Sequence, residues 1–101
     1  MPVAGREVLA LAQDMTIARD EFLRSLPAAV DHAPFRIDGD EIRSLDPGRK
    51  WRIAVQSLAD LSIGMFRLPR HHVEIFLTDC SVEETRRFLA RFELYFRRGG
   101  G

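Results

Sequence analysis

IGMFRLPRHHVEIFLT, residues 63–78, decides the fold, because two apolar runs flank a polar centre. We predict a β-hairpin with residues 69–72 as a four-residue loop. A two-residue loop at the same place would set Met65 against Glu74 and lose the matched pairs. The longer loop places Leu68 opposite Val73, Phe66 opposite Ile75, Gly64 opposite Leu77, Arg67 opposite Glu74 and Met65 opposite Phe76. The predicted hairpin therefore carries apolar side chains on both faces.

The composition is that of a small globular protein, since 46% of the 101 residues are hydrophobic and 30% are charged. We predict one compact domain over residues 1–98 and a flexible glycine tail over residues 99–101. The formal net charge is zero, so no overall field recruits nucleic acid or acidic lipid. Weak repulsion between copies also makes self-association easier.

Cys80 is the only cysteine, which excludes an intramolecular disulfide and a metal site built from several thiolates. The N-terminal residues include Arg6, Glu7 and Asp14, so they form neither a secretory apolar region nor a membrane span. We therefore predict a bacterial-type, cytoplasmic protein that is not inserted in a membrane.

Charge is divided unevenly along the chain. Residues 1–46 hold 5 Arg and 9 acids, a net −4, whereas residues 47–101 hold 10 basic residues and 6 acids, a net +4. The two halves should attract each other. All basic residues except Lys50 are arginine, which suits bidentate contacts to carboxylate or phosphate, although a GC-rich genome produces the same bias.

Apolar residues recur at helical spacing over residues 5–26, which predicts a first helix that ends before Pro27. Thr16 marks a break if two shorter helices form instead. Residues 28–34 form a connector. Asp38-Gly39 is typical of a type I′ turn and predicts a hairpin over residues 35–42, with Phe35 opposite Ile42 and Arg36 opposite Glu41.

Residues 46–61 fit a helix that starts at Asp46-Pro47, but they also alternate as a strand. We choose the strand, because Trp51, Ile53 and Val55 favour it, with residues 46–49 as the preceding turn. Ser81 and Glu84 form a capping box that starts a final helix. Its buried stripe is Val82, Thr85, Phe88, Leu89, Phe92 and Phe96, unless residues 92–96 leave the helix as an edge strand.

Together these elements predict an α+β fold: an N-terminal helix, four to five short antiparallel strands in a meander, and a C-terminal amphipathic helix packed on the sheet. Ile63, Met65 and Phe76 then lie on the second sheet face. They are covered by the first helix, or they form a surface for a partner protein or a second copy.

Residues with catalytic or metal-binding chemistry are few. His71 and His72, with Cys80 or His32, lack the spacing of a metal site, and the acidic run at residues 38–41 lacks the final glutamate of a calcium loop. Cys80 precedes a helix, where the dipole can lower a thiol pKa, but no base accompanies it. Phosphate-binding glycine loops are absent. We predict no catalytic residue, no metal and no cofactor.

A basic surface is the alternative candidate site. Arginines line the outer side of the last helix, and basic residues at positions 49, 50 and 52 continue this surface toward nucleic acid or a phosphate ligand. This surface consists of Arg49, Lys50, Arg52, Arg86, Arg87 and Arg91.

The chain ends in Arg97-Arg98-Gly99-Gly100-Gly101. This tail resembles that of ubiquitin-like modifiers and sulfur carriers, and the resemblance implies a terminal carboxylate that enters an activating site. Their core ends in a strand, whereas a helix precedes the tail here. We expect a non-catalytic domain that acts through a protein partner or homodimerisation; the alternatives are arginine-mediated nucleic-acid or phosphate binding, and a carrier role for the tail.

Overall fold

The computed structural model describes residues 6–100, with the backbone alone for residues 97–100. It contains five strands and two helices. In chain order these are β1 (Glu7–Met15), α1 (Arg19–Ala29), β2 (Phe35–Asp38), β3 (Glu41–Ser44), β4 (Trp51–Ile63), β5 (Phe66–Thr78) and α2 (Val82–Gly100).

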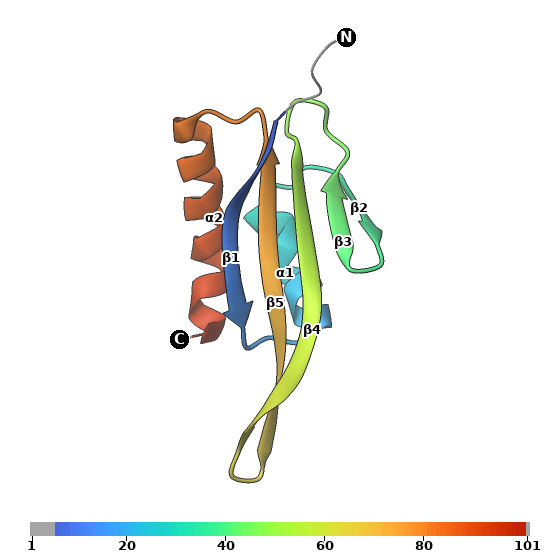
Figure 1. The fold of residues 1–101 in the computed structure, drawn as a ribbon, viewed down its shortest axis with the longest axis vertical. Coiled ribbons are helices and arrows are strands. Elements are labelled where there is room, and N and C mark those ends of the chain that lie inside the picture. Colours follow the sequence, from blue (N-terminus) through green and yellow to red (C-terminus); the bar gives the residue numbers. More distant parts are fainter. Residues whose placement is uncertain (1–5, 101) are drawn as a thin grey trace.

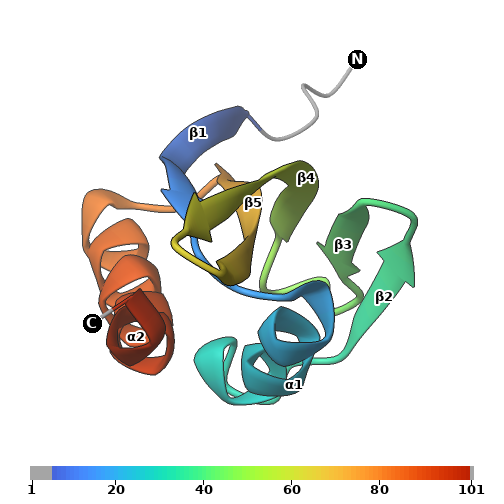
Figure 2. The ribbon, with the colours of Figure 1, turned by 90° about the horizontal axis from the view of Figure 1, so that it is seen from below.

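All five strands form one antiparallel sheet in the order β1-β5-β4-β3-β2. Strands β2 to β5 are a meander, and β1 is added at the free edge of β5. Both helices lie on the same side of the sheet (Figure 2). The α+β class and the C-terminal helix are confirmed, but the predicted N-terminal helix is wrong, because a strand comes first (Figure 1).

A β-bulge explains why β1 resembles a helix in sequence. Val8 lies opposite Leu77 and Leu11 opposite Ile75, so the pairing skips a residue between Leu9 and Leu11. An extra residue changes the spacing of one face from two to three. The apolar positions 8, 11 and 15 therefore follow a helical period while the backbone is extended.

The register predicted for residues 63–78 is also wrong. Strand β5 runs straight through residues 69–72, and the hairpin instead joins β4 to β5 with Ile63 opposite Phe66. Gly64 is the first of the two loop residues and has φ +58, as a type II′ turn requires. Met65 is the second loop residue, so it does not pair with Phe76.

The β2–β3 hairpin is confirmed, but its register differs from the prediction. Asp38 lies opposite Glu41 and Ile37 opposite Ile42, which makes Gly39 and Asp40 the two loop residues. Gly39 has φ +64. Both two-residue turns of the sheet therefore begin with glycine.

Most of the other predictions are confirmed, with Val82 as an exception. Residues 51–63 are a strand, and the Arg49 amide donates to the Asp46 carbonyl in the turn before it. The Ser81–Glu84 capping box forms in both directions, with distances of 2.8 and 3.1 Å. Helix α2 continues to Gly100, so the last residues do not form an edge strand. Val82 is 87% exposed and does not belong to the buried stripe.

The core lies between the sheet and the two helices. Alternate residues of β4 and β5 face the helices, including Ile53, Val55, Val73 and Ile75, and all are buried. The helices meet through aromatic side chains: the ring of Phe22 in α1 lies 6.3 Å from that of Phe92 and 4.7 Å from that of Phe96, while those two rings are 4.5 Å apart. These rings hold α2 against α1.

The molecule is elongated. Its radius of gyration is 14.4 Å, whereas about 12.7 Å is expected for a compact chain of this length. The reason is that β4 and β5 extend beyond both helices (Figure 1). Within the described residues, neither helix has the combination of length and apolarity that crossing a membrane requires.

A buried ring that joins the helices should contribute more to stability than an exposed apolar side chain on the same helix. Phe92 is 1% exposed and Leu94 is 64% exposed. We expect Phe92→Ala to lower the free energy of unfolding by about 3–5 kcal/mol and Leu94→Ala by no more than about 0.5 kcal/mol. Urea denaturation measures both. Equal losses would show that Phe92 does not anchor α2.

Ionic contacts at the end of β1 predict a pH dependence. His72 Nδ1 donates to Asp14 at 2.7 Å, and its Nε2 lies 3.4 Å from Glu74. The hydrogen bond to Asp14 is the main cause that raises the pKa of His72 above 6.5, and Glu74 adds to it. The resulting stabilisation is complete below pH 6.5 and is lost as the pH rises through the raised pKa.

We expect an NMR titration to place the His72 midpoint above 6.5 and to show that Asp14→Asn lowers it. The urea midpoint of the wild type should then decrease through the same pH interval, and decrease less in His72→Gln. A His72 midpoint that is unchanged in Asp14→Asn would contradict this assignment.

Candidate functional site

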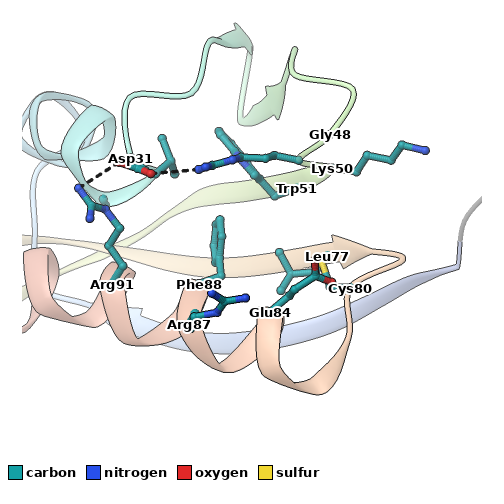
Figure 3. A pocket seen from close by; sticks show the side chains of 13 residues that line it. Asp31, Gly48, Lys50, Trp51, Leu77, Cys80, Glu84, Arg87, Phe88 and Arg91 are labelled. Atoms are coloured by element: carbon teal, nitrogen blue, oxygen red, sulfur yellow. Dashed lines mark hydrogen bonds and ion pairs between the residues drawn. The ribbon is translucent and has the colours of Figure 1, made fainter.

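A pocket of about 340 Å³ lies where the end of α1, the loop before β4 and the outer turns of α2 approach one another (Figure 3). Four of its lining residues are the cations Arg49, Lys50, Arg87 and Arg91. We call it the arginine pocket. Its other lining residues are Ala29, Val30, Asp31, Gly48, Trp51, Leu77, Cys80, Glu84 and Phe88.

Aromatic and aliphatic side chains form the inner wall of the arginine pocket. The Trp51 and Phe88 ring centroids are 6.2 Å apart, and Leu77 lies opposite Trp51 in the sheet. Trp51 is 4% exposed, and within the described part of the chain its indole Nε1 has no hydrogen-bond partner. A buried N–H group without a hydrogen-bond partner lowers the stability of the fold by about 1–3 kcal/mol.

Asp31 connects two of the pocket's arginines. Its carboxylate oxygens lie 3.3 Å from Arg49 and 3.6 Å from Arg91 (Figure 3). The main chain at Asp31 has φ 57 and the next residue, His32, has φ 58, a left-handed conformation that costs energy in residues other than glycine. This turn brings Asp31 to the pocket directly after α1.

Arg91 is held by further contacts. Its Nε donates to the Ala28 carbonyl at 2.8 Å, near the C-terminal end of α1, where a cation is favoured. Its guanidinium also lies 5.3 Å from the Tyr95 ring. The position of Arg91 is therefore fixed before any ligand is present.

Lys50 and Arg87 make fewer ionic contacts than Arg49 and Arg91. Among the residues that the structure describes, the Lys50 ammonium has no ion pair or hydrogen bond, and the Arg87 ion pair is a 3.9 Å contact to Glu83. Glu84 instead caps α2 through Ser81, and these hydrogen bonds are the main cause that lowers its pKa.

Cys80 is at the edge of the arginine pocket but is not an activated thiol. Burial is the main cause that raises its pKa, and the charges of Glu84 and Asp79 raise it further. This direction is the opposite of the one expected from the helix dipole. Nucleophilic chemistry needs the thiolate, so the surroundings of Cys80 disfavour it.

The predicted basic surface is only partly brought together. Arg86 pairs with Glu83 and does not line the pocket. Arg52 points to the other sheet face, because its neighbours Trp51 and Ile53 face the helices. The six basic residues therefore do not form one continuous track for a nucleic-acid backbone.

Arg52 is the centre of an ionic clamp across the open face of the sheet. It donates to both carboxylate oxygens of Glu7 in β1, at 2.9 and 3.1 Å, and to Glu41 in β3 at 2.8 Å. Its guanidinium lies 4.0 Å above the Phe76 ring of β5. The hydrogen bond is the main cause that lowers the pKa of Glu7 and raises that of Arg52. The clamp joins four strands.

The predicted partner surface is divided as well. Phe76 is part of the clamp, whereas Ile63 and Met65 are at the far end of the β4–β5 hairpin. The ten residue steps from Phe66 to Phe76 span about 33 Å of strand. Only Ile63 and Met65 remain together on an exposed surface.

Residues 58–70, which we call the arm, contain this second surface. None of them is buried. The register places Leu58 opposite Arg70, Leu61 opposite Leu68 and Ile63 opposite Phe66, and opposite residues share a face. A bulge between Leu58 and Leu61, across from Pro69, keeps the apolar residues on the same face. The sequence signal for the arm is the Gly64-Met65 turn, which the predicted loop at residues 69–72 does not use.

The histidines do not form a metal centre. His71 is buried, and its Nδ1 donates to the Ile17 carbonyl at 2.8 Å, while His72 is on the opposite face. Within residues 6–96, whose side chains the structure describes, no group of three or more His, Cys, Asp or Glu residues is placed to hold a metal ion.

Of the three residues of the predicted glycine tail, Gly99 and Gly100 form the end of α2, and Gly101 lies outside the described residues.

Family models, curated proteins and solved structures give no match to this chain.

Proposed function

We propose that this protein acts by self-association through the arm, as a non-catalytic interaction module whose partner is a second copy of the chain. The observation that carries the proposal is the exposure of large apolar side chains on the arm. Met65 is 97% exposed, Phe66 71%, Ile63 55% and Leu61 38%. Clustered apolar exposure of this kind marks interaction surfaces.

The main chain of the arm supports the same proposal. Strand β1 pairs with β5 only as far as His71, and β3 pairs with β4 only over residues 52–54. Both outer edges of the arm therefore lack a neighbouring strand among the described residues. A two-stranded ribbon without further cover is marginally stable in water, and an added strand supplies the missing hydrogen bonds.

A second copy fits this surface for two reasons. The net charge is zero, so copies do not repel each other strongly. Antiparallel pairing of one edge with its own copy is a two-fold contact, the commonest symmetry of soluble oligomers. An aromatic residue buries about 150–250 Å², and a specific interface buries about 800 Å² per partner. Phe66, the other apolar side chains of the arm and one strand edge together provide area of this order.

An acidic substitution on the arm should prevent association without changing the stability of the folded chain. We expect the wild type to be a dimer in sedimentation equilibrium at micromolar concentration and Phe66→Asp to be a monomer, because burying an unpaired carboxylate in the interface is costly. Since Phe66 is exposed in the single chain, its thermal unfolding midpoint at low concentration should not change.

Val82→Asp is the matched control, because Val82 is also exposed and an acidic residue is favourable at the start of a helix. It should remain dimeric. A wild-type chain that stays monomeric at all concentrations would contradict the proposal, and so would equal dissociation of both variants.

A further inference from the structure

We propose that the arginine pocket binds a small organic anion, a carboxylate or phosphate monoester attached to one apolar ring or short chain. This inference does not depend on self-association, because no residue of the arm lines the pocket. It rests on the charge, the wall chemistry and the size of the pocket together.

The charge of the pocket favours an anion. Four cationic side chains line it, against the carboxylates of Asp31 and Glu84. Both carboxylates already have partners: Asp31 is shared by two arginines, and Glu84 caps α2. The four cations therefore outnumber the two carboxylates of the lining, and the Arg87 contact to Glu83 is long, at 3.9 Å.

The geometry of the cations also suits an anionic group. The close-up shows Arg87 and Arg91 on successive turns of α2, whereas the Lys50 side chain, on the loop before β4, extends away from them (Figure 3). A guanidinium offers a planar pair of donors to carboxylate or phosphate. Arg91 already uses its Nε on Ala28 and one terminal nitrogen on Asp31. It therefore adds positive charge at a fixed position, and less side-chain freedom is lost when an anion binds.

The inner wall explains why the ligand should carry an apolar group. Trp51, Leu77 and Phe88 give the pocket an apolar side, which inorganic phosphate alone would leave in contact with water. The volume of about 340 Å³ is at the lower end of small-molecule sites. It accommodates a single ring or a short chain with its anionic group, and not a nucleic-acid segment.

Trp51 is the only tryptophan of the chain, so its fluorescence reports binding without a label. The probe is phenyl phosphate, with inorganic phosphate and phenol as its two fragments. We expect a saturable fluorescence change with phenyl phosphate, and affinity at least about tenfold higher than for either fragment. Absence of saturable binding, or equal binding of inorganic phosphate, would overturn the proposal.

Neighbouring arginines of α2 provide a matched pair of variants. Arg87 lines the pocket, whereas Arg86 pairs with Glu83 outside it. We expect Arg87→Gln to weaken phenyl phosphate binding by about fivefold or more, and Arg86→Gln to leave it within about twofold. Both residues are exposed, so thermal unfolding should confirm that each variant is folded.

Equal weakening by Arg86→Gln and Arg87→Gln would show that binding reflects the overall charge of the helix, which would overturn the assignment to the pocket. Tighter binding of a single-stranded oligonucleotide than of phenyl phosphate, with equal dependence on both arginines, would do the same and favour a nucleic-acid surface.

Discussion

The pairing of β4 with β5 is the constraint on which the rest of the structure depends. Each strand has thirteen residues, and they occupy neighbouring central positions of the sheet. One face of this pair supplies Ile53, Val55, Val73 and Ile75 to the core. Since neighbouring side chains point to opposite faces, a slip of one residue would exchange the apolar and charged faces. The Gly64 turn sets the register, and the other strands add to the two outer edges.

An element can be predicted from the sequence when the residues that determine it are close together in the chain. The capping box at Ser81 and Glu84 is contained in four residues, and it forms as expected. The strand that starts at Trp51 alternates buried and less buried residues over its first five positions, which favours a strand over the helix that the same residues also fit. By contrast, the period of β1 is interrupted by a bulge that exists only because β5 pairs beside it. The predicted loop of the long hairpin is at the wrong place because Pro69 and the two polar histidines suggest a loop, although the glycine at position 64 is the better turn former.

The candidate site shows the same limit. The sequence identifies the basic residues, but it does not identify which of them share a surface. Arg49 and Arg91 meet because a left-handed turn after α1 places Asp31 between them. Arg52 and Phe76 contact each other on the open face of the sheet. Arg52 therefore does not belong to the predicted basic surface, and Phe76 does not belong to the predicted apolar patch. The expected attraction between the acidic and basic halves is visible in these ion pairs, which join residues distant in sequence.

The two proposed surfaces are at opposite ends of the same hairpin. Trp51 and Leu77 pair at the arginine pocket, and Ile63 and Phe66 pair at the tip of the arm. The twelve steps between them correspond to about 40 Å of strand. The two strands between them pair in one register, and coupling over such a distance requires an element with two arrangements. Ligand binding and self-association should therefore be independent, and two copies joined by their arms would hold their pockets open at the far ends of the dimer.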